Sequence, residues 1–410
     1  MSANALHIQL HTEQPLIERL LPSQRTFEII VRPPAAAQSN ARPPLNLALV
    51  LDRSGSMSGD KLEYVKTAAV QLLELLSERD RVAVVAYDDQ VSLVSSSEAI
   101  NPATRARLQQ RIQAIRSGGS TNLSDGWLSG CREVAQHLAQ GQLNRALLLT
   151  DGLANCGIQD AEELAVHARN LYSQEISTST FGVGEGVNEH LLEAMSTTGG
   201  GSYYYIGSPH EIPGIFQAEF SELAAATARD VEIHLEVPAG VAAQVLGAWR
   251  SEVVGGKLRI FLGALASGRE QAVYVNLLFP PAGQQSEVTL QAQVLGHGAD
   301  NLLLEDSAAL TFSYAAPEAV RSGPQDLGVL ERASQVRVAE AANQSLKQER
   351  IGEREQAYRG LRQAIDACQP YMKPEDVELY EHMARRMRQG MDETDRKLSH
   401  NENYQKRRSK

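Results

Sequence analysis

Cysteine is scarce in this chain: only Cys131, Cys156 and Cys368 occur among 410 residues. Their number is odd, they lie far apart, and no two of them form a Cys-x-x-Cys pair, so they do not predict a disulfide framework. The first ten residues also lack the basic stretch followed by an apolar stretch that marks a secretory signal. Both absences favour the reducing cytoplasm as the compartment of this protein.

Long apolar runs and an excess of basic residues are missing as well. No stretch approaches the roughly 18–20 apolar residues that a membrane-spanning helix needs, so we expect no membrane span. The net charge of −11 argues against nucleic acid as a partner, because nucleic-acid-binding domains carry clustered Lys and Arg. The same charge favours basic or cationic partners, metal ions included.

The pattern of apolar and polar residues changes along the chain, which is long enough for two or three domains. Over 44–225, short apolar runs alternate with amphipathic stretches, which predicts an α/β domain with a doubly wound, mostly parallel sheet. Over 230–314, short alternating runs separated by Gly, Pro and Ser predict a β-sandwich. Residues 317–398 are rich in Ala, Leu, Glu, Gln and Arg and predict two or three helices, interrupted near Pro370 and Pro374.

These changes in patterning and composition divide the chain into six predicted regions. The Pro- and Ala-rich stretch between the first strands and the α/β domain is typical of a linker, and the polar C-terminus is typical of a frayed end. The regions are N-terminal strands at 1–34 that join the β-sandwich, a linker at 35–44, the α/β domain at 45–227, the β-sandwich at 228–316, a helical region at 317–398 and a disordered tail at 399–410.

Two carboxylates and three hydroxyls follow the apolar runs that predict central strands. The run 45–51 leads into the motif Asp-x-Ser-x-Ser, the segment 118–122 is Gly-Gly-Ser-Thr-Asn ahead of a predicted helix, and the run 146–150 is followed by Asp-Gly. Because open α/β sheets bind ligands at the carboxyl ends of their strands, we expect these three loops to meet. The candidate ligands are Asp52, Ser54, Ser56, Thr121 and Asp151.

All five candidate side chains offer hard oxygen atoms, and neither His nor Cys is among them. Such a set suits Mg²⁺, with Mn²⁺ or Ca²⁺ as alternatives, and does not suit Zn²⁺ or copper. Two carboxylates balance the charge of a dication and leave coordination positions for waters and for one ligand from outside. The sequence therefore predicts a Mg²⁺ site that a carboxylate of a protein partner completes.

The three motifs occur in the order in which von Willebrand factor A (VWA) domains carry them. Asp-x-Ser-x-Ser, Gly-Gly-x-Thr-Asn and Thr-Asp-Gly resemble the metal-ion-dependent adhesion site of that family, over roughly 44–223. The resemblance implies a Rossmann-like fold, a non-catalytic protein-binding function and metal coordination by the same five residues, with Asp151 often acting through water. The wider layout is similar, more loosely, to bacterial proteins related to inter-α-trypsin inhibitor heavy chains and calcium-activated chloride channel regulators.

Other functions stay open. One is a scaffold or assembly factor whose helices at 317–398 mediate self-association or docking while the α/β domain recruits a client. A more remote one is a serine hydrolase using Ser56 or Ser58, since Gly-Ser-Met-Ser-Gly is similar to a nucleophile elbow, although Met57 stands where the nucleophile belongs. The segment 209–225 runs directly into the predicted sandwich, so we also hypothesise that its shift couples the metal site to that domain.

Overall fold

The computed structural model describes residues 5–35, 42–152, 154–298 and 300–408. They form two compact units. The α/β unit comprises Gln38–Arg229 with His297–Leu302, and the second unit, here called the β-helical unit, comprises the rest of the chain. Within the described ranges, no helix is both long enough and apolar enough to cross a lipid bilayer.

Six strands form the sheet of the α/β unit. They are β4 (Leu45–Asp52), β5 (Arg81–Tyr87), β6 (Val91–Ala99), β7 (Leu143–Thr150), β8 (Ile176–Val183) and β9 (Gly200–Ile206). Their order is β6-β5-β4-β7-β8-β9, with β5 and β6 antiparallel and all other neighbours parallel. Counted along the chain this is the order 3-2-1-4-5-6, which reverses direction between β4 and β7. The predicted doubly wound, mostly parallel sheet is confirmed.

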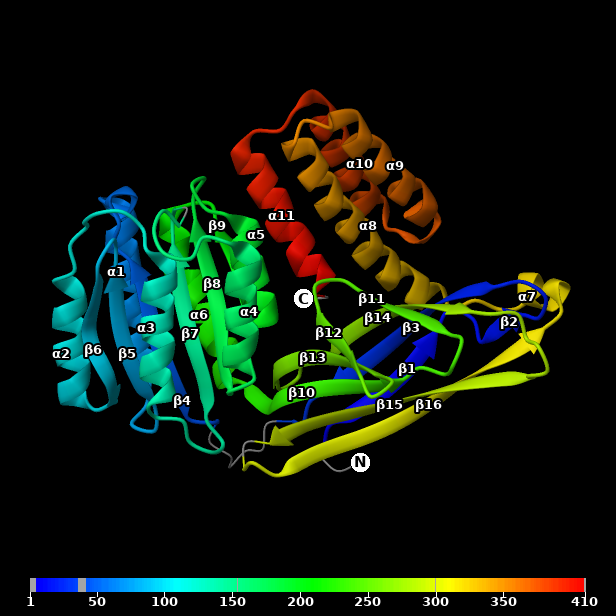
Figure 1. Ribbon diagram of the computed structural model, residues 1–410, viewed down its shortest axis with the longest axis horizontal. Helices are drawn as coiled ribbons and strands as arrows, with labels where there is room; N and C mark the ends of the chain where they lie inside the picture. Colours follow the sequence, from blue (N-terminus) through cyan, green and yellow to red (C-terminus); the bar gives the residue numbers. More distant parts are fainter. Residues whose placement is uncertain (1–4, 36–41, 153, 299, 409–410) are drawn as a thin grey trace. The chain divides into compact units, whose positions relative to one another are not determined.

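Helices cover both faces of this sheet (Figure 1). They are α1 (Asp60–Leu75), α2 (Pro102–Gln113), α3 (Leu123–Ala135), α4 (Ala161–Tyr172), α5 (Glu189–Thr198) and α6 (Ile212–Ala224), with short 3₁₀ turns η1 (Gly55–Met57) and η2 (Pro209–Glu211). Strands β4 and β7 are buried along their whole length, which explains why they are apolar without alternation. The side chains of Asn46 in β4 and Asn144 in β7 hydrogen-bond to each other at 3.0 Å.

The β-helical unit contains two sheets. One has the order β1-β3-β14-β11 and the other β12-β13-β10-β15-β16-β2. The strands are β1 (His7–Thr12), β2 (Leu16–Glu18), β3 (Ser23–Arg32), β10 (Ala226–Glu236), β11 (Ala242–Leu246), β12 (Arg250–Val254), β13 (Lys257–Ala266), β14 (Gln271–Phe279), β15 (Glu287–Gly298) and β16 (Leu303–Ala315). Phe27 and Phe279 of the first sheet contact Phe312 of the second, so the sheets face each other across an aromatic core.

The N-terminal strands belong to this sandwich. Strand β3 pairs antiparallel with β14 along nine residue pairs, and β1 pairs antiparallel with β3. The predicted linker at 35–44 falls mainly on 36–41, which lie outside the described residues.

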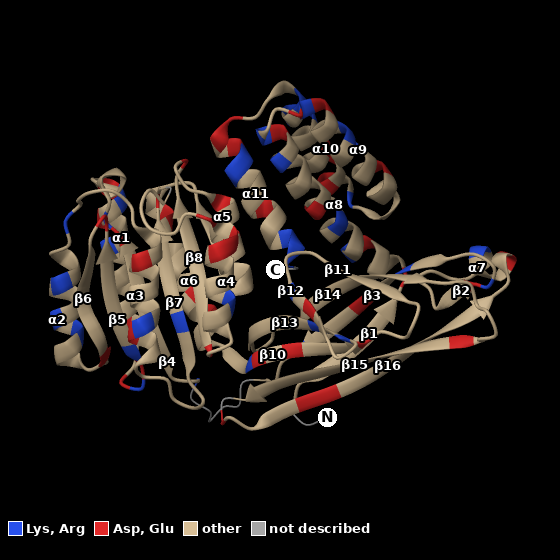
Figure 2. Cartoon of the chain, viewed as in Figure 1, with Lys and Arg blue, Asp and Glu red and all other residues tan. Residues whose placement is uncertain are grey.

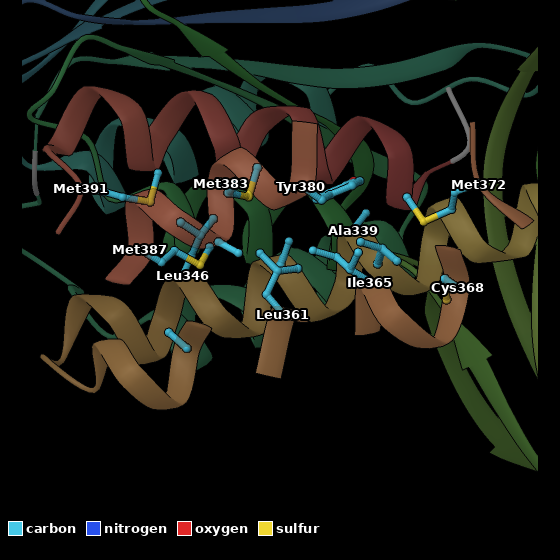
Figure 3. Close-up of a cluster of buried hydrophobic side chains, with 14 residues drawn as sticks. Ala339, Leu346, Leu361, Ile365, Cys368, Met372, Tyr380, Met383, Met387 and Met391 are labelled. Carbon is cyan, nitrogen blue, oxygen red and sulfur yellow. The ribbon is translucent and has the colours of Figure 1, made fainter. Parts of the chain in front are cut away.

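The C-terminal part of the β-helical unit contains more helices than predicted. They are α7 (Pro317–Ser322), α8 (Leu327–Arg350), α9 (Arg354–Cys368), the 3₁₀ turn η3 (Gln369–Tyr371), α10 (Pro374–Gln389) and α11 (Glu393–Arg407). Pro370 and Pro374 do separate α9 from α10, but Gly352 and Gly390 mark two further breaks that carry no proline. The prediction of two or three helices is therefore wrong. Side chains of α8, α9 and α10 form one apolar cluster between these helices (Figure 3).

The tail predicted to be disordered at 399–410 is also helical, because α11 continues to Arg407. Its polar sequence, with charges of both signs along the helices of this region (Figure 2), suggested a solvated end. The structure instead ties the helix end to the sandwich. The backbone N–H of Ala248 donates to the Arg407 carbonyl at 3.2 Å, and the Arg408 guanidinium lies 4.2 Å from the centre of the Trp249 ring. Residues 409–410 lie outside the described range.

Candidate metal site at the carboxyl edge of the α/β sheet

The candidate site lies where the sheet reverses direction, at the carboxyl ends of β4 and β7. Asp52 is the last residue of β4, and Asp151 follows β7 directly. Both side chains are buried, as are Ser54 and Thr121, with residue exposures of 0–2%. Ser56 is exposed. These oxygen atoms form a mostly buried cluster, here called the recess, which is bordered by the exposed residue Ser56.

Backbone hydrogen bonds hold the three predicted loops against one another. The Gly55 N–H donates to the Gly119 carbonyl at 2.9 Å, and the Gly118 N–H donates to the Arg53 carbonyl at 2.8 Å. The loop that follows Asp151 is attached as well, since the Asn155 N–H donates to the Thr121 carbonyl at 3.0 Å. These bonds fix the loops that carry the candidate residues.

The side chains of the five candidates meet at this junction. The Ser56 hydroxyl donates to Asp151 Oδ1 at 2.7 Å, and the Ser54 and Ser56 hydroxyl oxygens lie 3.2 Å apart. A Cβ atom added to Gly152 would lie 3.6 Å from Thr121 Oγ1 and 3.7 Å from Ser56 Oγ, so these two hydroxyls border the same small space. The structure thus brings together residues that are up to about 100 positions apart in the chain.

Asp52 is held by neutral donors. The Ser54 N–H donates to Asp52 Oδ1 at 2.8 Å, and the Thr150 hydroxyl donates to Oδ2 at 2.6 Å. Burial, with a smaller contribution from the charge of Asp151, outweighs the lowering effect of these hydrogen bonds and raises the pKa of Asp52 to about 6. A raised pKa means that the negative charge of Asp52 is poorly compensated, as expected of a carboxylate that lacks a cation.

Two residues at the rim were not singled out from the sequence. Lys61, near the start of α1, forms an ion pair with Asp151 Oδ2. Asp88, at the end of β5, accepts hydrogen bonds from the Gly119 N–H and from the Arg53 guanidinium, both at 3.2 Å. Asp88 therefore connects two of the three loops. Neither residue belongs to the three motifs: Asp88 lies in the turn between β5 and β6, and Lys61 lies five residues beyond the second serine of the first motif.

The donor set is one of oxygen atoms. Across the described ranges, no group of three or more His, Cys, Asp or Glu side chains is arranged to hold a metal ion. The recess offers two carboxylates and three hydroxyls instead, a combination that fits hard divalent cations such as Mg²⁺. The Ser56 hydroxyl donates to a carboxylate, whereas the serine of a Ser-His-Asp triad donates to an imidazole. The imidazole of His210 lies 2.7 Å from the hydroxyl of Ser208, inside its own turn.

Known proteins share this α/β region. Residues 46–218 match the family model of the von Willebrand factor type A domain. The uncharacterized protein sll0103 of Synechocystis is 32% identical over 216 residues, which cover 52% of this chain and 50% of that protein. Human inter-alpha-trypsin inhibitor heavy chain H3 is 30% identical over 161 residues, which cover 37% of this chain and 18% of the heavy chain. The matches therefore span half or less of these relatives.

A solved structure resembles almost the whole chain. It is a von Willebrand factor type A protein from Catenulispora acidiphila, with a TM-score of 0.75 at 17% sequence identity, and the match covers 93% of this chain and 89% of that one. At this identity the likeness shows the fold alone, including strands and C-terminal helices beyond the α/β sheet. The family model and the relatives identify residues 46–218 as a von Willebrand factor A domain, a module that commonly mediates protein–protein interaction.

Proposed function

We propose that the VWA domain is a divalent-cation-dependent protein-binding module without catalytic activity. The observation that carries the proposal is the recess at the ends of β4 and β7, in which two buried carboxylates and three hydroxyls converge. The raised pKa of Asp52 supports it, because a carboxylate buried among neutral donors favours a cation nearby. The proposed ligands are Asp52, Ser54, Ser56, Thr121 and Asp151.

Mg²⁺ is the ion that this set suits best, with Mn²⁺ or Ca²⁺ as alternatives. When bound, such an ion supplies an open coordination position that a carboxylate can fill. The chain's own contribution is to hold the oxygens in place: the hydrogen-bonded loops fix Ser54, Ser56 and Thr121, and Thr150 orients Asp52. The exposed position of Ser56 gives a partner access to the recess.

The proposed partner is a protein that presents an Asp or Glu side chain. A metal–carboxylate contact is charge-assisted and directional, and a modest interface around it would provide the remaining affinity. Two features support binding over catalysis: the Ser56 hydroxyl is bonded to a carboxylate, and the recess lies in a domain type that commonly mediates protein interaction.

Isothermal titration calorimetry of the full chain with Mg²⁺ and Mn²⁺, after treatment with a chelator, tests the metal site. Asp52→Asn should weaken binding by about 100-fold or more, since even changes beyond the direct ligands cost about 10- to 100-fold. Glu162→Gln, an exposed charge change on α4, is the control and should bind as the wild type does. Equal affinity of Asp52→Asn and wild type would exclude the proposed site.

Affinity capture from the source cell then tests the partner. The immobilised chain is offered a cell extract with Mg²⁺ or with chelator, and the experiment is repeated with Asp52→Asn. A protein retained only by the wild type and only with Mg²⁺ supports the proposal. A partner that binds equally well in chelator would contradict metal-dependent recognition.

A further inference from the structure

The two carboxylates of the recess are not equally compensated. Both oxygens of Asp151 accept hydrogen bonds, Oδ1 from Ser56 and Oδ2 from the ammonium group of Lys61. Asp52, by contrast, accepts only from the Ser54 N–H and the Thr150 hydroxyl in the bonds described above. The side chain of Asp151 is fully buried and that of Lys61 is 33% exposed, so the lysine reaches into the recess from its rim.

The position of Lys61 in its helix is electrostatically unfavourable for a lysine. It is the second residue of α1, where unpaired backbone N–H groups give the helix a partial positive charge that disfavours cations. Gly59 precedes the helix with φ 78° and ψ −139°, a backbone conformation that favours glycine. Helix α1 begins at the next residue, so that Lys61 lies beside the recess. The contact with Asp151 compensates for the poor helix position, which indicates a role at the recess.

The charges of the residues at the recess indicate the role of Lys61. Asp52 and Asp151 bring two negative charges when ionised, and Lys61 offsets one of them. A dication that binds the five proposed ligands therefore meets a recess that already holds a cation next to one of its carboxylates. Coulombic repulsion between the ammonium and the ion is strong at such short range, because the surroundings are largely shielded from water.

We propose that Lys61 is a built-in counter-ion that competes with the divalent cation for Asp151. It stabilises the metal-free recess and lowers the affinity for the ion, so that the site binds the ion more weakly alone than together with a carboxylate ligand. Once the recess is filled, Lys61 leaves a net positive charge at the rim that attracts an acidic ligand. This inference rests on the proposed metal-binding function and adds its regulation.

The experiment compares Lys61→Met with the wild-type full chain. Calorimetric titration with Mg²⁺ and Mn²⁺ should give affinity about tenfold higher, since one neighbouring charge shifts equilibria at a carboxylate by about one to three decades. In chelator, Lys61→Met should unfold at a lower temperature than wild type, and added Mn²⁺ should raise its unfolding temperature more. Arg132→Met is the matched control: it removes an exposed positive charge from α3 of the same domain and should change neither value.

The outcomes separate this inference from the proposed function. Absence of ion binding in wild type and variant alike would overturn the proposed function. Binding by both with equal affinity, or weaker binding by Lys61→Met, would overturn the counter-ion role alone. Lys61→Gln and Lys61→Arg keep the test decisive if Lys61→Met does not fold: the glutamine variant must bind the ion more tightly, and the arginine variant must bind it as the wild type does.

Discussion

Two buried carboxylates, one in each unit of this chain, have different kinds of partner. In the VWA domain, Asp52 accepts hydrogen bonds from the Ser54 N–H and the Thr150 hydroxyl, which are both neutral. In the C-terminal helices, the fully buried side chain of Glu349 accepts two hydrogen bonds, at 2.6 and 2.9 Å, from the guanidinium of Arg396. Neither side chain is accessible to solvent, but only Glu349 has a full positive charge to match its own.

The pKa values of the two groups move in opposite directions. Burial raises the pKa of Asp52 to about 6. Burial also acts to raise the pKa of Glu349, but the hydrogen bonds from Arg396 and from the Met391 N–H outweigh it and hold this pKa below its ordinary value. Glu349 is therefore electrostatically satisfied within the fold, whereas Asp52 is not.

Other buried carboxylates follow the pattern of Glu349. Glu28 in β3 accepts two hydrogen bonds, each 2.7 Å long, from Arg332 of α8 and thereby attaches that helix to the sandwich. Glu219 in α6 accepts a hydrogen bond of 2.7 Å from Arg145 in β7. Several buried carboxylates of this chain thus have a guanidinium partner, whereas Glu13, like Asp52, accepts hydrogen bonds from neutral donors and has a raised pKa.

The largest effect that we expect from this contrast is at Glu349. Glu349→Gln should destabilise the C-terminal helices by about 3 kcal/mol, because it leaves Arg396, whose side chain is 16% exposed, without its buried partner. Scanning calorimetry should show a lower unfolding temperature, and hydrogen exchange should accelerate in α8 and α11. The VWA domain should keep its affinity for Mg²⁺.

Glu375→Gln in α10 is the matched control, since its side chain is exposed and the same charge is removed. It should leave the unfolding temperature unchanged. An equal effect of the two substitutions would mean that Glu349 contributes no more to stability than a surface charge does. Glu349 could then not serve as the structural carboxylate with which Asp52 is compared.

Much of the candidate site could be predicted from the sequence, because strand ends can be located from local patterns. The apolar run 45–51 and the run 146–150 mark central strands, and the parallel arrangement carries the residues after them to one edge. Lys61 and Asp88 were missed for a different reason. Their roles depend on contacts between loops that are far apart in the sequence. A lysine in a helix or an aspartate in a turn has no sequence pattern that identifies such a distant partner.

The same limit explains the errors in the fold. Strand β7 was predicted to start at residue 146, since Asn144 and Arg145 are unusual in a buried strand. Arg145 is tolerated there because Glu219 neutralises it from a helix 74 residues further on.

Glu219 also accepts hydrogen bonds from Ser179 of β8 and from Tyr204 of β9, so α6 is bonded to three strands. An axial shift of α6 must break these bonds, which weighs against the hypothesis that 209–225 couples the site to the sandwich.

A smaller effect is expected from a substitution that disturbs Asp88, a carboxylate at the rim that has the Arg53 guanidinium as its partner. A Cβ atom on Gly118 would lie 2.1 Å from Asp88 Oδ2, which already accepts from the Gly119 N–H. Gly118→Ala must therefore displace Asp88 and loosen the loop that carries Thr121 from the loop that begins at Arg53. We expect a loss of about 2 kcal/mol in stability, the usual cost of overpacking, and weaker Mg²⁺ binding by calorimetry.

Gly214→Ala provides the control for this substitution. Gly214 lies in α6 and has no atom within 4 Å of its added Cβ, so alanine should be neutral or slightly stabilising in the helix. If Gly118→Ala bound Mg²⁺ with wild-type affinity, the connection through Asp88 would not be needed to hold the recess together.

The smallest expected effect has the opposite sign and concerns Asp52 in the absence of metal. Its pKa is about 6 in the folded chain against an ordinary value of 3.8, so ionisation opposes folding. The wild type in chelator should therefore lose stability as pH rises through about 6 and regain it as pH falls towards 4. Asp52→Asn cannot ionise and should be more stable than wild type at pH 7.5, by about 1–2 kcal/mol, within the upper bound that a shift of two pH units allows.

Scanning calorimetry in chelator at pH 7.5 and pH 4.5 measures this difference. The advantage of Asp52→Asn should be largest at pH 7.5 and clearly smaller at pH 4.5, because the penalty grows between the ordinary pKa of 3.8 and the folded-chain pKa of about 6. Glu349→Gln should show the reverse trend, because the lowered pKa of Glu349 means that its stabilising charge is present at pH 7.5 and is lost as pH falls. If Asp52→Asn were less stable than wild type at pH 7.5, Asp52 would be an ordinary structural carboxylate, and its poor compensation could no longer be taken as the mark of a cation site.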